Sequence, residues 1–311
     1  MKKVLITILV LVGILFAYIL IAAKVIQNKK GEFSYEQLSK EPDGKEEYVN
    51  CTDGTRLRVL SAGQGKTVVL AHGFGGTIRD WNLVFDKLVL AGYHVIAFEQ
   101  RGHHKSVEGT DGIGSKQMAA DYKVILEHFD VKNAVLVGHS MGGFLAIRFM
   151  IDFPEVAKNR LKAVLIMSSF AGDISKDNEQ NKIQIPLIEK GYINTIFNNK
   201  SLGTLFSSTL IGEPYGAIVE SSLDNFKVQN YSKLVPILKA FVDENYYQQL
   251  GQILISGTIL VGSADKTAPS FHSVNLSKGI KSASLVYVEG KGHLLNWEAP
   301  DKVVEEIIKL F

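Results

Sequence analysis

A serine stands between glycines at the end of an apolar run in the stretch "VLVGHSMGGF", residues 135–144. Two interpretations fit this pattern: a tight turn with no further role, or a turn that exposes the hydroxyl of Ser140 as a nucleophile. A free serine hydroxyl is a poor nucleophile near neutral pH, so it needs a base, and a histidine base needs an acceptor that fixes its tautomer. The second interpretation therefore requires the rest of the chain to supply both groups.

Short apolar runs with β-branched residues alternate with longer helical patterns along the chain. The runs are residues 56–60, 67–72, 94–99, 134–139, 163–168, 258–262 and 284–289. Continuous apolar strands separated by helices are typical of a mostly parallel sheet whose two faces are both covered. We therefore expect an α/β fold with a mostly parallel central sheet and helices on both faces.

The helical patterns fit between these runs. Residues 81–90 and 118–129 carry apolar side chains three and four positions apart, as a helix packed on a sheet requires. Residues 141–153 also form a helical pattern, which Pro154 is expected to end. Between residues 172 and 251 no strand run of comparable strength occurs, and prolines and glycines break several short helical patterns. This segment is expected to be an inserted cap of short helices over the sheet.

The glycine-flanked serine lies in "GHSMG", residues 138–142, which fits the G-x-S-x-G pattern between a strand and a helix. With this motif the chain resembles the α/β-hydrolase fold family, and within it the serine hydrolases that carry a helical cap. Glycines suit such an elbow because strand and helix approach closely there and the turn is strained. The resemblance covers most of residues 51–172 and 251–311 and is weak across the cap.

The resemblance implies a catalytic triad in the chain order serine, acid, histidine. His293 in "VEGKGHLLNWEAP" follows the last strand run and precedes the terminal helix, which is the position of the family's catalytic histidine. Asp265 in "LVGSADKTAP" follows the run at residues 258–262 and resembles the family's acid loop. Asp173 is the alternative acid. We therefore predict Ser140 as nucleophile, His293 as base and Asp265 as its acceptor.

A glycine-rich loop, "AHGFGG" at residues 71–76, leaves an earlier strand run. In the family one oxyanion donor follows this His-Gly pair and the other follows the nucleophile. The resemblance therefore assigns the oxyanion hole to the backbone N–H groups of Phe74 and Met141. His72 and His139 match family positions beside the active site, and supporting roles are expected for them.

A further match is "FEQRGHHKS", residues 98–106, with two departures from the family's pattern. Glu99 stands where the family usually has aspartate, and His104 stands where glycine is usual. Both residues lie in a supporting loop outside the predicted triad. The departures therefore affect the expected geometry of this turn rather than the predicted chemistry.

The amino terminus carries an uncharged stretch, "VLITILVLVGILFAYILIAA" at residues 4–23, between Lys2 and Lys3 on one side and Lys24 on the other. As a helix with a rise of about 1.5 Å per residue, it would cross a hydrocarbon layer of about 30 Å. Signal cleavage usually requires a small residue at the third position before the cut. A cut after Ala22 would place Leu20 there, and a cut after Ala23 would place Ile21 there. We expect a single-pass anchor with the body on the extracytoplasmic side; secretion after signal cleavage is the alternative.

Five segments are therefore predicted along the chain. They are the transmembrane anchor and its flank at 1–30, a polar linker at 31–50, the first part of the hydrolase core at 51–172, the helical cap at 173–250 and the second part of the core at 251–311.

Composition narrows the possible partners. The 34 lysines and arginines nearly balance 32 aspartates and glutamates, and no basic stripe with interleaved aromatics indicates nucleic-acid binding. Cys51 is the only cysteine, so neither an intrachain disulfide nor a cysteine-based metal cluster is possible. The resemblance implies no metal and no organic cofactor.

These observations predict a serine hydrolase that cleaves carboxylic esters through an acyl-enzyme, without a cofactor. An anchored enzyme meets acyl lipids at high local concentration, which favours a monoacylglycerol or related lipid ester as substrate. A C–C bond hydrolase of the dienoic diketone type shares these motifs and remains an alternative, as does a catalytically silent binding protein, although all three triad positions are intact. Apolar cap residues would line an acyl tunnel or form the cap's own core: Phe197, Leu202, Leu205, Phe206, Leu210, Ile211 and Phe226.

Overall fold

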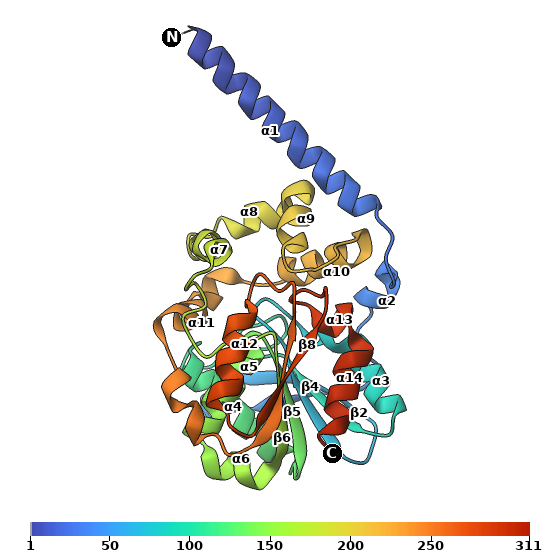
Figure 1. The fold of residues 1–311 in the computed structure, drawn as a ribbon. Helices are drawn as coiled ribbons and strands as arrows, with labels where there is room; N and C mark the ends of the chain where they lie inside the picture. Colours follow the sequence, from blue (N-terminus) through green and yellow to red (C-terminus); the bar gives the residue numbers. More distant parts are fainter. Residues whose placement is uncertain (1) are drawn as a thin grey trace.

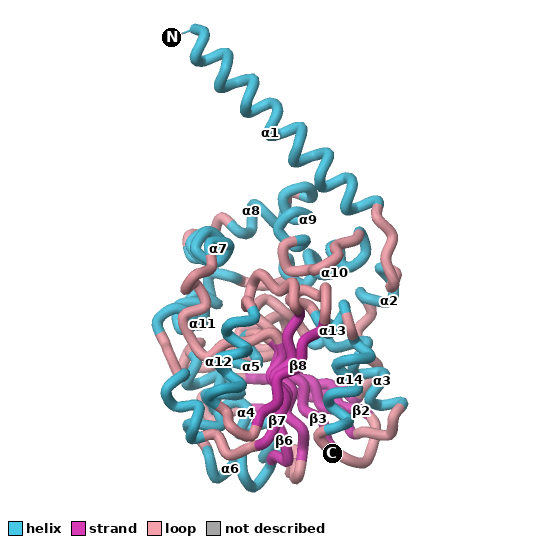
Figure 2. Tube along the Cα trace, viewed as in Figure 1, coloured by secondary structure: helices cyan, strands magenta, loops and turns pink. Residues whose placement is uncertain are grey.

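The computed structural model describes residues 2–311, and at its centre lies a twisted eight-stranded sheet (Figures 1 and 2). The strands are β1 (Lys45–Asn50), β2 (Arg56–Ala62), β3 (Thr67–Ala71), β4 (His94–Phe98), β5 (Ala134–His139), β6 (Leu161–Met167), β7 (Ser256–Gly262) and β8 (Ala283–Val288). Their order across the sheet is β1-β2-β4-β3-β5-β6-β7-β8. Strands β3 to β8 pair in parallel, whereas β1–β2 and β2–β4 are antiparallel. The expected mostly parallel sheet is confirmed.

Each predicted strand run overlaps one strand from β2 to β8, because buried strands are the most apolar segments of the core. Every residue of β5 is buried, and β3 and β4 are partly exposed only at their first residues. By contrast, β8 at the sheet edge is only partly buried. Burial of central strands on both faces is what a parallel sheet covered by helices requires.

Helices cover both faces of the sheet, as predicted (Figure 1). The helices around the sheet are α3 (Asn82–Leu90), α4 (Ser115–His128), α5 (Met141–Asp152), α6 (Pro154–Arg160), α12 (Ser270–Gly279), α13 (Leu295–Glu298) and α14 (Pro300–Lys309), with short 3-10 turns at Ile78–Trp81 and Tyr247–Gln252. Side chains of α3 and α14 pack into one apolar cluster with β3 and β5. Side chains of α4, α5 and α12 join a second cluster on the opposite face.

Five helices between β6 and β7 form the inserted cap above the sheet (Figure 1). They are α7 (Glu179–Glu189), α8 (Ile193–Asn198), α9 (Lys200–Ser208), α10 (Gly216–Lys227) and α11 (Tyr231–Asp243). Two of them hold a proline inside the helix, Pro186 in α7 and Pro236 in α11. The cap lies over the carboxyl ends of the parallel strands, which is where ligands bind in open α/β sheets.

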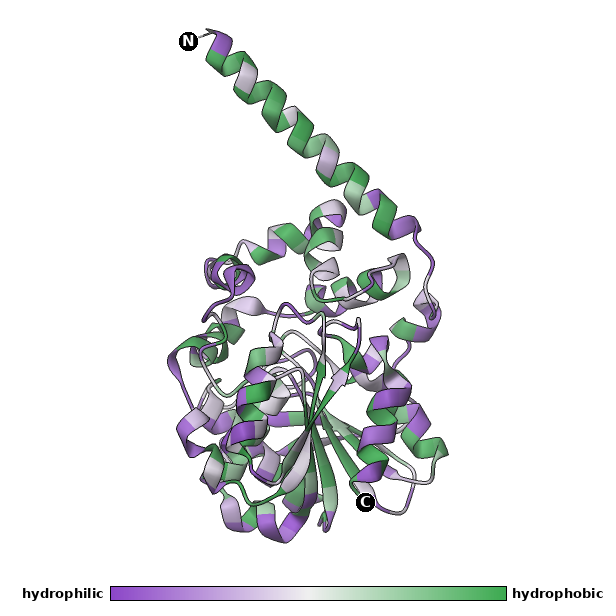
Figure 3. Ribbon diagram, in the orientation of Figure 1, coloured by the Kyte–Doolittle hydropathy of each residue, from purple (hydrophilic) through white to green (hydrophobic). Residues whose placement is uncertain are grey.

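The amino-terminal helix α1 (Lys2–Asn28) projects away from the body on the cap side, and apolar residues cover nearly its whole length (Figures 1 and 3). Within the described residues, Lys3–Asn28 is the one helix long and apolar enough to cross a membrane. Its final turns pack on α9 and α10 of the cap. Ala23 is fully buried there, although the helix is exposed from Lys3 to Tyr18.

The segment expected to be a polar linker, residues 31–50, is folded onto the body instead. It contains α2 (Tyr35–Ser39), capped by Ser34, and strand β1, which pairs with β2 along its whole length. Leu38 is the one fully buried side chain of α2 and packs beside Trp297. The prediction failed because an edge strand with charged outward side chains, "KEEYVN", resembles a linker in composition.

Candidate active site

Ser140 occupies the sharp turn between β5 and α5. Its backbone lies at φ 51° and ψ −115°, a region that a non-glycine residue adopts only under strain. Helix α5 begins at the next residue, Met141, so the serine stands at the positive end of a helix dipole. This is the strand–turn–helix context that the sequence predicted for the nucleophile elbow.

The glycines of the elbow allow close approach between backbones. A Cβ on Gly138 would lie 2.5 Å from the carbonyl oxygen of Gly142, and a Cβ on Gly142 would lie 2.3 Å from that of Ala71. Both distances are too short for carbon and oxygen, so a larger residue would separate α5 from β3 and β5. The elbow therefore needs glycine at these two positions for space rather than for backbone freedom.

Hydrogen bonds hold the strained serine in place. Its amide donates to the carbonyl of Met167 at 2.9 Å, and its own carbonyl accepts from the Ser169 hydroxyl at 2.7 Å. The Tyr122 hydroxyl, on α4, donates to the carbonyl of Gly142 at 2.9 Å. Ser169 and Tyr122 were missed by sequence reasoning, because no motif marks residues that act only on the backbone of another residue.

His293 and Asp265 lie side by side at the ends of β8 and β7. Nδ1 of His293 is 2.9 Å from Oδ2 of Asp265, and the Asp265 side chain is fully buried. The other carboxylate oxygen accepts from the amides of Thr267 and Ala268, each at 2.9 Å. Both carboxylate oxygens are thus engaged, which fixes the acid against the imidazole.

The alternative acid, Asp173, lies elsewhere. Its carboxylate accepts from the hydroxyl of Ser175 at 3.4 Å, and it makes no hydrogen bond to His293 among the described residues. Asp265 is therefore the acid that the fold brings to the predicted base.

Glu298 anchors the loop that carries His293. Its carboxylate accepts from the amides of Gly212 at 2.8 Å, Gly292 at 3.0 Å and Leu294 at 3.2 Å. Burial raises the pKa of Glu298, although these three amides oppose the rise by favouring the charged form. The sequence analysis gave Glu298 no role; an acidic residue in the mostly apolar stretch "HLLNWEAP" was the available signal.

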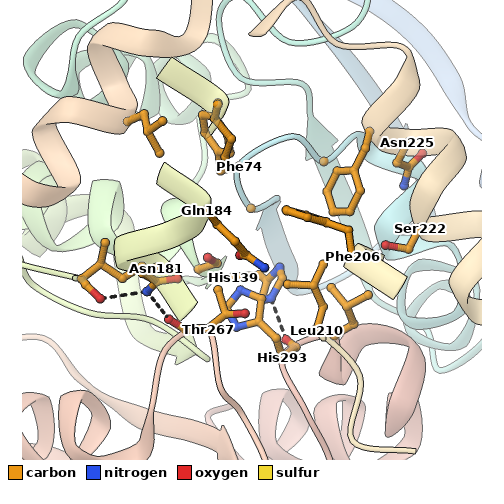
Figure 4. Close-up of a pocket in the computed structure, with 18 of the residues that line it drawn as sticks. Phe74, His139, Asn181, Gln184, Phe206, Leu210, Ser222, Asn225, Thr267 and His293 are labelled. Carbon is orange, nitrogen blue, oxygen red and sulfur yellow. Dashed lines mark hydrogen bonds between the residues drawn. The ribbon is translucent and has the colours of Figure 1, made fainter. Parts of the chain in front are cut away.

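His139 also holds the His293 loop, as its supporting role predicted. Its Nε2 lies 2.9 Å from the carbonyl oxygen of His293, so that nitrogen carries the proton and donates (Figure 4). Burial lowers the pKa of His139 well below the usual range, and proximity to His293 lowers it further. His139 therefore remains neutral and acts as a fixed donor to the loop.

The two predicted oxyanion donors belong to segments that lie close together in the fold. Met141 is the first residue of α5, so its amide has no partner within the helix. Neither this amide nor that of Phe74 donates to another described group. A Cβ on Gly73 would lie 3.2 Å from the Ser140 side chain, which shows how closely this loop approaches the serine.

His72 ties the glycine-rich loop at residues 71–76, the predicted oxyanion loop, to the segment after β4. Its Nε2 accepts from the amide of Gln100 at 3.0 Å, and Nδ1 lies 2.8 Å from the carbonyl oxygen of Gly73. Burial lowers the pKa of His72 to about 3, so the ring stays neutral with its proton on Nδ1. The expected supporting role is thus one of backbone positioning.

The two departures from the family's pattern compensate each other. Glu99 is fully buried, and its carboxylate contacts Nδ1 of His104 at 2.8 Å and Nη1 of Arg58 at 3.0 Å. His104 has φ 46°, in the left-handed region that favours glycine. The longer acid therefore reaches a histidine that takes the glycine's backbone conformation.

One group of side chains has the composition of a cation site. Glu41, Glu99 and His104 place ligand atoms within 4.8 Å of one another. Arg58 donates to both carboxylates, at 2.8 Å to Glu41 and 3.0 Å to Glu99. Its guanidinium already supplies the positive charge that these carboxylates need, so the group is an ion-pair network.

A mostly apolar pocket lies between the elbow and the cap, with about 930 Å³ of space including its open mouth. Ser140 and His293 both line it, and Figure 4 shows Phe206 and Leu210 on one side of His293 and Asn181 and Thr267 on the other. Of the cap residues expected to line a tunnel, four do so: Phe197, Phe206, Leu210 and Phe226. Leu202, Leu205 and Ile211 do not line it.

Asp80 brings a carboxyl group into this apolar pocket. It accepts hydrogen bonds from the Thr77 amide at 3.2 Å and from Asn225 of the cap. Burial raises the pKa of Asp80 to about 7, against the opposing effects of Arg79 and these hydrogen bonds. Sequence reasoning did not single out Asp80, because only the fold brings the cap over it.

Known proteins resemble this chain over most of its length. Residues 66–300 match the family described as the alpha/beta hydrolase fold. A non-heme haloperoxidase from Rhodococcus erythropolis is 27% identical over 256 residues, covering 79% of this chain and 92% of that protein. A 2-hydroxy-6-oxononadienedioate/2-hydroxy-6-oxononatrienedioate hydrolase from Paraburkholderia xenovorans is 28% identical over 273 residues, covering 82% and 91%.

The solved structures agree on the fold. An esterase from Exiguobacterium antarcticum superposes with a TM-score of 0.75 at 18% identity, covering 84% of this chain and 97% of that one. The match over residues 66–300 includes the elbow, the oxyanion loop, the cap and the His293 loop. This chain belongs to the α/β-hydrolase fold family.

Proposed function

We propose that this protein is a membrane-anchored serine hydrolase that cleaves carboxylic esters through an acyl-enzyme intermediate. The observation that carries the proposal is the 2.9 Å contact between Nδ1 of His293 and Oδ2 of Asp265, in a pocket that Ser140 also lines. A carboxylate on Nδ1 leaves Nε2 of the imidazole free to accept a proton, which is the state that a general base needs. Membership in a hydrolase family supports the same reaction class.

In the proposed reaction, the Ser140 hydroxyl attacks the ester carbonyl while Nε2 of His293 takes its proton. Asp265 orients the imidazole and stabilises the imidazolium that forms. Collapse of the tetrahedral intermediate breaks the bond to the alcohol, which leaves with the proton from His293. Water then repeats the sequence on the acyl-enzyme, with His293 as base, and releases the acid and free Ser140.

The amides of Phe74 and Met141 would stabilise the negative oxygen of each tetrahedral intermediate. Each donor of this kind lowers the activation free energy by about 2.7 to 4 kcal/mol. The partial positive charge at the start of α5 acts in the same direction. No step in this scheme needs a metal or an organic cofactor.

Carbon–carbon bond hydrolysis is the second candidate, because a relative named for that type of substrate is 28% identical. A substrate with two carboxylates would need cationic partners in the pocket. Among the described residues, no lysine or arginine lines this pocket, and Asp80 adds a carboxyl group. The chemistry of the lining therefore favours a neutral ester over an acidic diketone.

The lipid-ester assignment rests on two features. Helix α1 has the length and composition of a membrane span, and aromatic and aliphatic side chains dominate the pocket lining. We therefore propose a monoacylglycerol or related lipid ester as substrate, with the body held on the extracytoplasmic side of the membrane.

Rates on three substrates test the proposal: a short-chain ester, a long-chain monoacylglycerol and a dienoic diketone acid. We expect hydrolysis of both esters by the wild-type chain, a preference for the monoacylglycerol, and no turnover by Ser140→Ala. Turnover of the diketone alone would contradict the assignment as an esterase and favour a C–C bond hydrolase. If the purified wild-type chain hydrolyses none of the three, the protein is a binding protein on a hydrolase scaffold.

A further inference from the structure

Helix α1 is joined rigidly to the cap rather than through a flexible tether. The Gln27 side chain donates to the Thr204 hydroxyl of α9 at 2.9 Å, and the amide of Gly216, at the start of α10, donates to the carbonyl of Lys29 at 3.0 Å. A Cβ on Gly216 would lie 2.3 Å from the carbonyl oxygen of Gln27. The backbones of anchor and cap therefore touch, and the direction of α1 fixes the orientation of the cap.

The position of this junction along α1 sets the height of the cap above a bilayer. Ile19 is the first described residue of α1 whose side chain is partly covered, and Ala23, at the end of the uncharged stretch, is fully buried. At about 1.5 Å per residue, contact with the cap begins about 6 Å before the apolar stretch ends. If α1 spans a membrane, α9 must lie at the boundary between lipid tails and headgroups.

The cap surface beside this junction has the composition of an interfacial surface. Figure 1 shows α7, α8 and α9 at the end of the molecule from which α1 projects. Ile183 is 64% exposed and Tyr192 is 58% exposed on this part of the cap. Exposed charged residues of both signs accompany them: Lys182, Lys190 and Lys200, with Glu179, which pairs with Lys182, and Glu189. Tyrosine is enriched at membrane interfaces, and lysines near the surface attract anionic headgroups.

The same three helices line the pocket on their inner side. Ile188 of α7, Phe197 of α8 and Phe206 of α9 all face the cavity that Ser140 and His293 line. Only the thickness of one helix layer therefore separates the exposed surface of the cap from the pocket. A lipid that leaves the bilayer beneath this layer has a short path to the serine.

We propose that the outer surface of α7, α8 and α9 rests on the lipid bilayer and that ester lipids pass from the bilayer through the cap into the pocket. This surface, which we call the lipid-facing cap surface, carries Lys182, Ile183, Lys190, Tyr192 and Lys200. The final turns of α1 hold it against the membrane. The inference rests on the proposed membrane anchor and deepens the proposed lipid-ester specificity by giving the substrate its route.

A fluorescent probe tests the contact with lipid without reference to catalysis. Tyr192→Cys and, at the opposite end of the sheet, Leu254→Cys are each labelled in a full-length Cys51→Ser chain; Leu254 is 82% exposed and serves as the matched control. The chains are reconstituted in vesicles of equal parts phosphatidylcholine and phosphatidylglycerol with a nitroxide-labelled lipid. We expect strong quenching at position 192 and little at 254. Equal quenching at the two positions overturns the proposal.

The route is tested with a variant that separates the cap from α1. Gly216→Val would force the Gln27 carbonyl away, whereas Gly251→Val is the matched control because a Cβ on Gly251 would meet no other group within 4 Å. We expect Gly216→Val to lower hydrolysis of monooleoylglycerol in vesicles about tenfold and to leave a water-soluble butyrate ester within about twofold.

Equal loss on both substrates, or no loss on either, contradicts the route through the cap. Failure of the proposed function has a different signature. In that case the wild-type chain hydrolyses neither ester, while the quenching experiment still decides whether this surface touches lipid.

Discussion

The nucleophile elbow and the cap border the same pocket, but different contacts hold them. At the elbow, backbones meet so closely that a Cβ on Gly142 would lie 2.3 Å from a carbonyl oxygen. In the cap, a Cβ on Gly203 of α9 would meet the side chain of Leu223 at 2.8 Å, and a leucine side chain can move. The comparison indicates that the position of Ser140 is fixed by close backbone contacts, whereas the contact between α9 and α10 at Gly203 depends mainly on the side chain of Leu223.

The largest difference in activity is expected between variants of the two candidate acids, Asp265 and Asp173. Asp265→Asn removes the acceptor that holds His293 in the required tautomer, so we expect kcat for ester hydrolysis to fall about 10⁴-fold. Asp173→Asn, at the base of the cap, is expected to stay within about twofold. Steady-state rates on one soluble ester measure both variants. A similar loss in the two would contradict the assignment of Asp265.

Matched glycine variants test the comparison itself. We expect Gly142→Ala to lower the free energy of unfolding by about 3 kcal/mol, because α5 must move away from β3. Gly203→Ala is expected to stay within about 1 kcal/mol of the wild type, because Leu223 can adjust and alanine favours the helix. Chemical denaturation of both variants gives the answer. If Gly203→Ala costs as much as Gly142→Ala, the cap is as rigid as the elbow.

A smaller effect is expected where the cap touches the oxyanion loop. Nε2 of Gln229 donates to the carbonyls of Gly75 at 3.3 Å and Gly76 at 3.1 Å, and its Oε1 accepts from the amide of His104 at 3.0 Å. Gln229→Ala would free the loop that carries Phe74, and we expect kcat to fall about tenfold. Ser232→Ala, an exposed position in α11, is the matched control. Equal kcat in the two variants would show that the loop needs no support from the cap.

The contact of Asp80 with the cap is expected to make the stability of the protein depend on pH. Burial raises the pKa of Asp80 from 3.8 to about 7, so the folded state holds a proton that the unfolded state has already lost. This proton uptake makes the wild type lose stability as pH rises between these two values. Asp80→Asn removes the titration, so we expect the variant to gain stability relative to the wild type over the same interval. Unfolding curves of both proteins at several pH values measure this difference. If the free energies of unfolding of the wild type and Asp80→Asn change equally with pH, Asp80 is an ordinary carboxyl and the prediction is wrong.

The strands and the residues at their ends could be predicted from the sequence because they depend on local patterns. Continuous apolar runs marked seven strands, and the elbow, acid loop and histidine loop each follow one of them. The segment at residues 31–50 could not be predicted, because β1 is charged and is stabilised mainly by pairing with β2. These residues form a strand because they pair with β2, and their own composition does not indicate one.

Long-range contacts account for most of what the sequence did not predict around the site. Glu298 holds the His293 loop through amides as far away in sequence as Gly212. Gln229 reaches the oxyanion loop across more than 150 positions, and Gln27 reaches Thr204 across 177. No local pattern predicts such pairings, whereas the proposed triad residues follow from their positions at strand ends and from the resemblance to the family.

Covalent labelling of Ser140 tests the central claim most directly. We predict that a fluorophosphonate adds its phosphonyl mass to the peptide containing Ser140 in the wild-type chain, that Ser140→Ala shows no adduct, and that His293→Ala is labelled far more slowly. Adduct formation on another residue, or a rate for His293→Ala equal to that of the wild type, would contradict the account of a serine activated by His293.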